Sequence, residues 1–278
     1  AAAQNLADVA AMGAVPTALL VGLVAPPELP VAWALGLSEG LAQGCRGTGA
    51  GVVGGDLSSG PVVVVTVTAL GDLQGRRPVL RSGARPGDVV AVAGSLGRSA
   101  AGLALLQSGW PDAGALAQAG DVQAPATALA ALASAVVRTH RRPEPPYAAG
   151  PEAALAGATA MLDVSDGLLR DAGRIAEASG VCIDLDGAAL GGGFVDPLRP
   201  VADALARKGP AAGDDEAWTW VLTGGEDHGL LATFPPGSVP ASFTVVGSVH
   251  AQLEGRANVL VDGHEPSVLV PGWDHFRP

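Results

Sequence analysis

Four short acidic motifs contain the residues of this chain that are best suited to chemistry. They are NLAD at residues 5–8, GGD at 54–56, DVSDG at 163–167 and GGED at 224–227. The last three contain glycine and follow apolar runs that are typical of strands. Carboxylates at strand ends, beside flexible glycine backbone, suit the binding of Mg²⁺ together with phosphate groups. Taken together, the motifs therefore indicate phosphoryl chemistry.

The DVSDG motif has the spacing that best fits a metal and phosphate site. Asp163 and Asp166 flank Ser165 at the expected start of a helix, and a helix N-terminus favours anions. Two carboxylates at this spacing would hold a metal and a phosphate together. The alternative is that Ser165 or Asp166 only caps the helix. Capping does not account for Asp163, which follows two apolar residues and is expected at the inner end of a strand.

The other three motifs each have an ordinary interpretation as well. In GGD, Gly55 lets the main chain approach a phosphate and Asp56 can bind a metal, but an isolated GGD is also a common turn. GGED likewise places glycines beside carboxylates, here Glu226 and Asp227, and an ordinary turn is again the alternative. Asp8 is expected on the polar side of an alanine-rich helix, where a solvated carboxylate is the usual interpretation.

Two further residues stand out by type. Arg81 precedes Ser82 and Gly83, and its planar guanidinium can pair with a phosphate, although a surface arginine in a loop is an equal alternative. Trp273 lies in GWDHF near the end of a chain in which aromatic residues make up only 4%. It is either a core residue or a stacking surface for a flat ring.

Composition and missing motifs exclude several other classes of function. The net charge of −11 argues against nucleic acid or an anionic membrane surface as a partner. The longest uncharged run, 9–27, is interrupted by glycine and proline, so no membrane span is expected. The five histidines lack zinc-site spacing, and neither a G-x-x-x-x-G-K-[ST] nor a G-x-S-x-G motif occurs. The two cysteines are expected to be buried thiols of a cytoplasmic protein.

The apolar and glycine patterns predict alternating helices and strands, which favour α/β layers. RSGARPGD at 81–88 is rich in glycine and proline, so we place a domain boundary between residues 82 and 83. The expected strands are 17–24, 52–55, 61–70, 89–94, 181–185, 218–223, 229–234, 243–249 and 258–263, with DLSSG as a loop between the second and third. The expected helices are 1–12, 29–43, 97–107, 122–138, 167–178 and 197–208.

Taken in this order, NLADVAAMGA, VVGGDLSSG, RSGARPGD, MLDVSDGL, LTGGEDH and GWDHF resemble the motifs of the thiamine-monophosphate kinase family. The resemblance covers nearly the whole chain, and the combination of motifs is specific although each is short. It implies a two-domain aminoimidazole ribonucleotide synthetase-like fold, with an α/β domain over 1–82 that pairs across a homodimer and an α+β domain over 83–278. The implied reaction transfers the γ-phosphoryl group of ATP to thiamine monophosphate, assisted by several Mg²⁺ ions, and gives thiamine diphosphate.

The resemblance also implies roles for individual residues. Metal ligands are implied at Asp8, Asp56, Asp163 and Asp166, and contacts to ATP at Gly55, Asp56, Arg81 and Ser165. Glu226, Asp227 and Trp273 correspond to positions near the thiamine substrate, where a carboxylate and an indole would suit a cationic thiazolium ring. No protein nucleophile or base is implied, because the attacking phosphate is already ionised at about pH 7.

The chain departs from the family pattern at its start. Family members carry a further segment there, with a GDDAA-type aspartate pair and a D-M-x-x-x-x-H-F motif, and we expect that such a segment is omitted before Ala1. A sister enzyme, an aminoimidazole ribonucleotide or selenophosphate synthetase, stays open as an alternative, although GGED and GWDHF favour the thiamine enzyme. A second alternative is a non-catalytic protein that binds thiamine phosphates or nucleotides.

Overall fold

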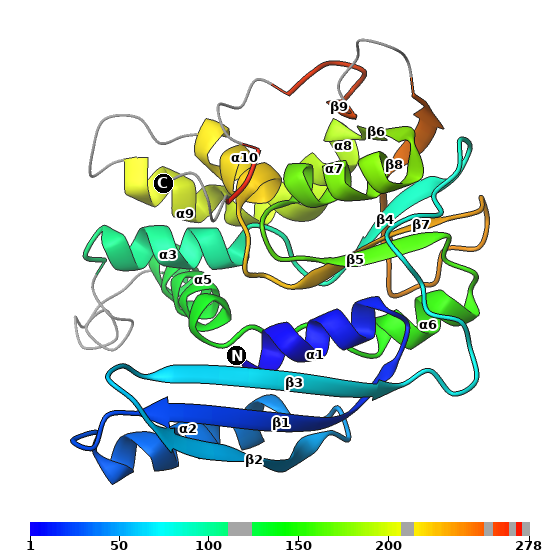
Figure 1. The fold of residues 1–278 in the computed structure, drawn as a ribbon. Coiled ribbons are helices and arrows are strands. Elements are labelled where there is room, and N and C mark those ends of the chain that lie inside the picture. The colour runs from blue at the N-terminus through cyan, green and yellow to red at the C-terminus, as the bar shows by residue number, and fades with distance from the viewer. Residues whose placement is uncertain (111–123, 207–213, 253–257, 267–270, 274–278) are drawn as a thin grey trace.

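Two β-sheets organise the chain, of which the computed structural model describes residues 1–110, 124–206, 214–252, 258–266 and 271–273 (Figure 1). The first sheet has three strands in the order β2-β1-β3, and the second has six strands in the order β5-β7-β4-β8-β6-β9. Helix α1 (Ala2–Ala11) lies between the two sheets. It is rich in alanine, the best helix former, and ends before Gly13, whose φ of +76° costs glycine no strain.

The first sheet is formed by β1 (Val15–Ala25), β2 (Gly51–Ser59) and β3 (Val64–Asp72), and α2 (Val31–Gly44) links β1 to β2. Strand β1 is parallel to β2 and antiparallel to β3. Leu6 of α1, Leu19 of β1 and Leu41 of α2 are buried together, so both helices cover the same face of the sheet. Strands β2 and β3 still expose apolar side chains, among them Leu57, which is 72% exposed.

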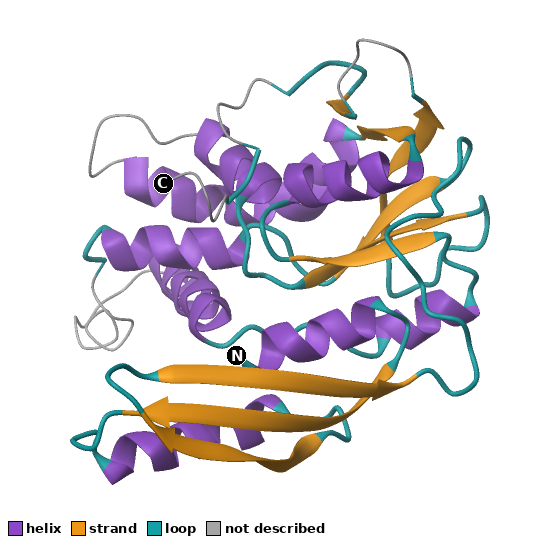
Figure 2. Cartoon of the chain, in the orientation of Figure 1, coloured by secondary structure: helices purple, strands orange, loops and turns teal. Residues whose placement is uncertain are grey.

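The second sheet consists of β4 (Val89–Ala93), β5 (Ala160–Val164), β6 (Val181–Leu185), β7 (Gly229–Phe234), β8 (Thr244–Ala251) and β9 (Val259–Val261). The helices around it are α3 (Arg98–Gln107), α5 (Ala124–Arg141), α6 (Ala149–Leu155), α7 (Leu168–Ser179), α8 (Gly187–Leu190), the π-helical turn η1 (Gly191–Val195), the 3₁₀ turn η2 (Asp196–Leu198), α9 (Arg199–Ala206) and α10 (Asp214–Thr223). Helices therefore make up much of the second part of the chain (Figure 2).

Both faces of the second sheet are covered, and β4 at its centre shows how. Val90 and Val92 belong to the large core formed with α3, α5, α7 and α10. Ala91 and Ala93, which point to the other face, pack in a smaller core with residues of α1 and α6. Burying a valine side chain stabilises the fold by about 1.5–3 kcal/mol. Because α1 covers part of this sheet, it brings residues of the first motif to the second sheet.

The expected α/β plus α+β organisation is confirmed, but two element predictions are wrong. The aromatic, β-branched run at 218–223 forms the end of helix α10, because Trp220 and Val221 are buried in the large core from a helix. The expected loop DLSSG continues strand β2, whose pairing with β1 extends to Ser59. Helix α6 was not predicted. The expected helices 122–138 and 197–208 extend partly into residues outside the described ones. None of the described helices combines the length and apolar character needed to cross a bilayer.

Candidate active site

Asp8 of the first motif and Asp163 of the third come together between the sheets. Helix α1 contacts β5, and the two residues line one cleft of about 570 Å³ together with Asn5 and Arg81. Partial burial, the negative charge of Asp163 and a hydrogen bond with it raise the pKa of Asp8 to about 6, against the opposing charges of His228 and Arg81. Two carboxyls in this arrangement repel each other when both are ionised, so the site favours a cation.

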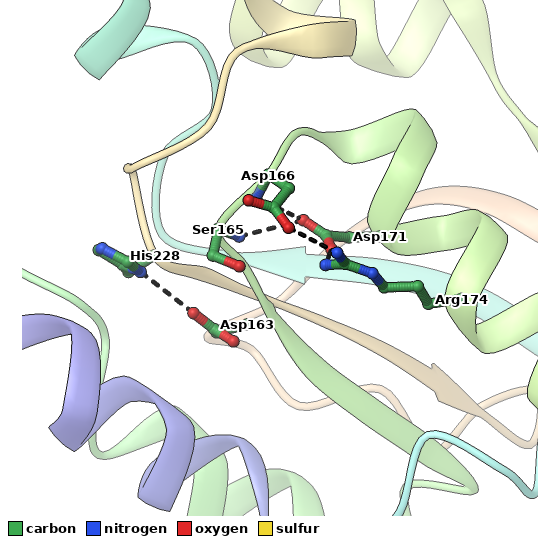
Figure 3. Close-up of polar contacts among 6 residues, drawn as sticks. All are labelled: Asp163, Ser165, Asp166, Asp171, Arg174 and His228. Carbon is green, nitrogen blue, oxygen red and sulfur yellow. Dashed lines mark hydrogen bonds and ion pairs between the residues drawn. The ribbon is translucent and has the colours of Figure 1, made fainter. Parts of the chain in front are cut away.

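His228 binds Asp163 on the side away from solvent. Its Nδ1 lies 3.1 Å from Asp163 Oδ2, and the side chain is only 1% exposed (Figure 3). The antiparallel pairing of Val164 with Gly229 fixes this contact. Burial opposes the protonation of His228, but its hydrogen bond to Asp163 and its ion pair with Glu226 outweigh burial and raise its pKa to about 9. This residue was not predicted from the sequence, in which adjacency to GGED was the only signal.

The GGED loop places its two carboxylates in different surroundings. Glu226 Oε2 lies 3.7 Å from His228 Nε2, and this ion pair lowers the pKa of Glu226. The backbone of Glu226 has a φ of +66°, an uncommon value for a residue with a side chain. Asp227 instead points into the protein, where it accepts hydrogen bonds from Ser95 Oγ at 2.7 Å and from the Ser99 amide at 3.1 Å. The structure therefore does not bring Asp227 to Asp8 and Asp163.

The main chain of the DVSDG loop is held by two segments that are remote in sequence. The amides of His228, Glu226 and Trp273 donate to the carbonyl oxygens of Val164, Ser165 and Asp166, respectively, at 3.1, 2.9 and 2.9 Å. The GGEDH segment and Trp273 thus meet at this loop. Trp273 itself is 64% exposed beside it. An exposed indole next to the candidate site suits a stacking surface better than a core residue.

The alternative that Ser165 or Asp166 caps helix α7 is wrong. The cap position is Gly167, with a φ of +118°, and no side chain caps the helix there. The side chain that satisfies the loop comes from the first turn of the helix, where Asp171 Oδ2 accepts the amides of Ser165 and Asp166 at 3.0 Å each. Arg174 Nη1 and Nη2 bind Asp171 Oδ1 and Asp166 Oδ2 (Figure 3). Burial raises the pKa of Asp171 to about 6 against the effect of these bonds.

Asp56 and Gly55 lie elsewhere, in the middle of strand β2. The expectation that GGD ends a strand is wrong, because β2 continues through both residues. Asp56 is exposed, accepts a hydrogen bond from Ser58 Oγ at 2.8 Å, and does not line the cleft of Asp8. The strand pairing explains Gly55, since a Cβ there would lie 1.8 Å from the carbonyl oxygen of Val21.

The donor atoms fit a magnesium ion that substrate phosphates help to hold. Among the described residues, no group of three or more His, Cys, Asp and Glu side chains forms a complete protein metal site. Mg²⁺ is commonly bound by one or two carboxylates, with waters and phosphate oxygens completing its octahedral shell. Asp8 and Asp163 supply such a pair, and their mutual repulsion is what a cation relieves.

Comparison with known proteins gives the class to which this fold and site belong. The model of the AIR synthase related protein N-terminal domain matches residues 1–73, and that of the C-terminal domain matches residues 85–206. The chain therefore belongs to the AIR synthase related family. The hydrogenase maturation protein HypE shares this fold at 17% sequence identity, with a TM-score of 0.62 over 93% of this chain and 77% of that one.

Within this class, relatives with higher sequence identity are kinases. The thiamine-monophosphate kinase of Mycobacterium tuberculosis H37Rv is 49% identical over 276 residues, which cover 99% of this chain and 73% of the relative. That of Escherichia coli K12 is 34% identical and is covered to 78% by 99% of this chain. The solved structure of AaThiL complexed with AMPPCP and TMP has a TM-score of 0.76 and 30% identity, and covers 99% of this chain and 78% of that one. The chain belongs to the thiamine-monophosphate kinase family.

Proposed function

We propose that this chain catalyses the ATP-dependent phosphorylation of thiamine monophosphate to thiamine diphosphate. The observation that carries the proposal is the approach of Asp8 on α1 to Asp163 on β5, beside the loop where the GGEDH and GW segments meet. The solved relative complexed with AMPPCP and TMP supports a site for both a nucleotide and thiamine monophosphate in this fold. We also propose a cytoplasmic location and a domain boundary between residues 82 and 83.

The carboxylates Asp8, Asp163 and Asp166 are the proposed ligands of Mg²⁺ ions that enter with the nucleotide. When bound, Mg²⁺ neutralises phosphate charge and orients the transferred group. Ser165 and Arg81 are proposed to contact ATP, because Ser165 lies between the two loop carboxylates and Arg81 lines the cleft of Asp8. An arginine fork there binds phosphate oxygens in pairs.

Glu226 and Trp273 are the proposed contacts of the thiamine group. Both are exposed beside the DVSDG loop, to which each is bound through its amide. A carboxylate attracts the thiazolium charge, and an indole face adds a cation–π attraction of about 0.5–2 kcal/mol. Asp227 is proposed to act indirectly, since its bonds to Ser95 and Ser99 fix the end of the loop that presents Glu226.

The proposed reaction is a direct in-line displacement. A phosphate oxygen of thiamine monophosphate forms a bond to the γ-phosphorus of ATP, while the bond from that phosphorus to the β,γ-bridging oxygen breaks and ADP leaves with the electron pair. The residues of this chain position the two anions and offset their repulsion, which is most of what phosphoryl transfer requires.

The exposed apolar side chains of the first sheet support a homodimer. Leu20 on β1 and Val64 and Leu70 on β3 are exposed on the sheet face that also carries Asp56, and such groups are typical of subunit contacts. A dimer formed by this sheet places Asp56 at the contact. We therefore propose that Asp56 and Gly55 serve a nucleotide site that the second copy completes. Mixing inactive Asp56→Asn and Asp163→Asn proteins would then restore activity in the mixed dimers, whereas residues acting within one chain would give none.

The test of the proposed activity is incubation of the purified chain with ATP, Mg²⁺ and thiamine monophosphate, followed by chromatography for thiamine diphosphate. The Asp163→Asn protein is the control for contaminating kinases. Formation of thiamine diphosphate by the unaltered chain only is the expected result. Calorimetric binding of both ligands without product would indicate the non-catalytic binding protein instead. Absence of both product and thiamine monophosphate binding would favour a sister synthetase.

A further inference from the structure

Asp171 and Arg174 form a polar cluster one turn into helix α7, behind the DVSDG loop. The Asp171 side chain is fully buried, and a single oxygen, Oδ2, accepts both the Ser165 and the Asp166 amides. Because these two amides are consecutive, their shared acceptor fixes the plane of the peptide group between them. The carbonyl oxygens of the same residues are bound from the other side by Glu226 and Trp273.

Arg174 extends this arrangement from the main chain to a side chain. Its Nη1 binds Asp171 Oδ1 and its Nη2 binds Asp166 Oδ2, both at 2.5 Å. A guanidinium is planar and its two terminal nitrogens have fixed directions, so a bridge of this kind sets the orientation of both carboxylates. The direction of the Asp166 carboxylate therefore depends on Arg174, and that of Arg174 depends on Asp171.

Stability alone does not explain a charge at position 171. The position faces the core with Leu168, Ala172 and Ile175, which are all fully buried. Burying an ion pair in such a place commonly stabilises a protein no more than apolar side chains of the same size would. What the carboxylate adds here is a fixed loop conformation, because an apolar side chain accepts no amide.

We propose that Asp171 and Arg174 are positioning residues for the metal-bound nucleotide. They hold the Asp166 carboxylate and the peptide of Ser165 and Asp166 in the arrangement that receives Mg²⁺ and phosphate. The inference rests on the proposed function, in which Asp166 is a metal ligand. Residues that orient the ligands of a metal commonly change its affinity by about 10–100-fold when they are altered.

The test compares nucleotide binding with and without metal, using AMPPCP in calorimetric titrations. Arg174→Gln removes both ion pairs from a partly exposed position. Arg174→Lys keeps the positive charge but loses the two-pronged guanidinium. Asp171→Asn keeps the size of the side chain but removes its charge. The matched control is Arg199→Gln, because Arg199 forms an ion pair with Asp196 at the same i,i+3 spacing, 2.8 Å long, away from the loop. Hydrogen exchange of the Ser165 and Asp166 amides reports the loop directly.

We expect the affinity for Mg²⁺·AMPPCP to fall about tenfold in Arg174→Gln and Asp171→Asn and less in Arg174→Lys. Affinities for metal-free AMPPCP and thiamine monophosphate should stay within about twofold, and Asp171→Asn should lose amide protection at both loop residues. Folded variants with unchanged Mg²⁺·AMPPCP affinity would show a merely structural role and overturn the proposal. A wild-type chain that binds Mg²⁺·AMPPCP but makes no product refutes only the kinase activity, and one that does not bind it refutes both proposals.

Discussion

The DVSDG loop and the GGD segment look alike in sequence, but the structure treats them differently. Asp163 is buried near the end of strand β5 in the second sheet, within reach of His228 and Asp8. Asp56 lies on an exposed edge strand, where its side chain accepts a hydrogen bond from the nearby Ser58. Their glycines differ too, since Gly167 turns the chain into a helix, whereas Gly55 lets two strands approach.

This difference shows that an aspartate beside a glycine can occupy different structural environments. In the loop, the surroundings of the carboxylates are fixed by bonds from the GGEDH segment and from Trp273, so the geometry exists within one chain. On the edge strand, little in the described part of the chain fixes Asp56. A glycine-flanked aspartate therefore has to be judged by what holds its backbone.

The largest expected effect is that of Asp163→Asn. We expect turnover to fall by at least about a hundredfold, because the variant removes the charge that binds His228 and that attracts a cation together with Asp8. The protein should stay folded, although its thermal midpoint should fall by a few degrees because the contact with protonated His228 is weakened. Steady-state kinetics and thermal unfolding measure both quantities, with Asp196→Asn as a surface control. Near-normal turnover of Asp163→Asn would contradict the assignment of the active site to the DVSDG loop rather than to the GGD segment of β2.

The next largest effects are expected from alanine substitutions of one glycine in each segment, Gly167 and Gly55. An added Cβ would lie 2.5 Å from the Thr223 carbonyl oxygen at Gly167 and 1.8 Å from that of Val21 at Gly55. Gly167→Ala should reduce activity about tenfold or more, because strain at φ +118° and the clash displace Asp166. Gly55→Ala should destabilise the chain by about 1–3 kcal/mol as β2 moves away from β1.

Urea unfolding and steady-state assays of both glycine variants measure these effects. Gly51→Ala serves as the control on β2, since nothing lies within 4 Å of an added Cβ there. Equal losses of stability in Gly51→Ala and Gly55→Ala would contradict the close approach of β2 to β1.

A smaller effect is expected from Trp273→Ala. The KM for thiamine monophosphate should rise about fivefold to tenfold while the KM for ATP stays the same, because the exposed indole is a proposed contact of the thiazolium alone. Trp33→Ala is the matched control, since that tryptophan is also exposed but lies on α2. A parallel rise in both KM values would instead indicate that the loop, which Trp273 binds through its amide, has been disturbed.

The smallest effect concerns pH and the contact between Asp163 and His228. The pKa of His228 is raised from 6.5 to about 9 in the folded chain, so protonation stabilises the fold fully below pH 6.5, and this stabilisation is lost as the pH rises through about 9. In Mg²⁺-free buffer, the thermal midpoint of the wild type should fall between these pH values by a few degrees more than that of His228→Gln. His250→Gln should behave like the wild type. Parallel curves for all three proteins would contradict the raised pKa.

The sequence predicts those features that depend on local pattern. Asp163 at the end of a buried strand, the helix after Gly167 and the break at Gly13 all follow from neighbouring residues. The failures involve distant partners. The run WTWVLT has strand-like residues, but packing in the large core makes it a helix, and the ladder with β1 extends β2 through DLSSG.

The sequence predicted the acidic residues of the site but not the residues that hold them in place. The motifs identified Asp163 and Asp166, whereas His228 and Asp171 were missed because their roles arise from contacts across a strand pair and a helix turn. A buried histidine carries no sequence signal until its strand register is known. The approach of Asp8 to Asp163 likewise depends on α1 packing beneath a sheet formed much later in the chain.

The position of β4 at the centre of the second sheet has a consequence for synthesis. This strand is made early, and Val90 to Ala93 are fully buried in the finished protein. Both of its neighbours, β7 and β8, come from the last part of the described chain. At about 5–20 residues per second, a ribosome therefore exposes an unpaired apolar strand for on the order of ten seconds. The second domain cannot close its core before nearly the whole chain has emerged, so we expect nascent chains stalled before residue 229 to depend on chaperones for solubility.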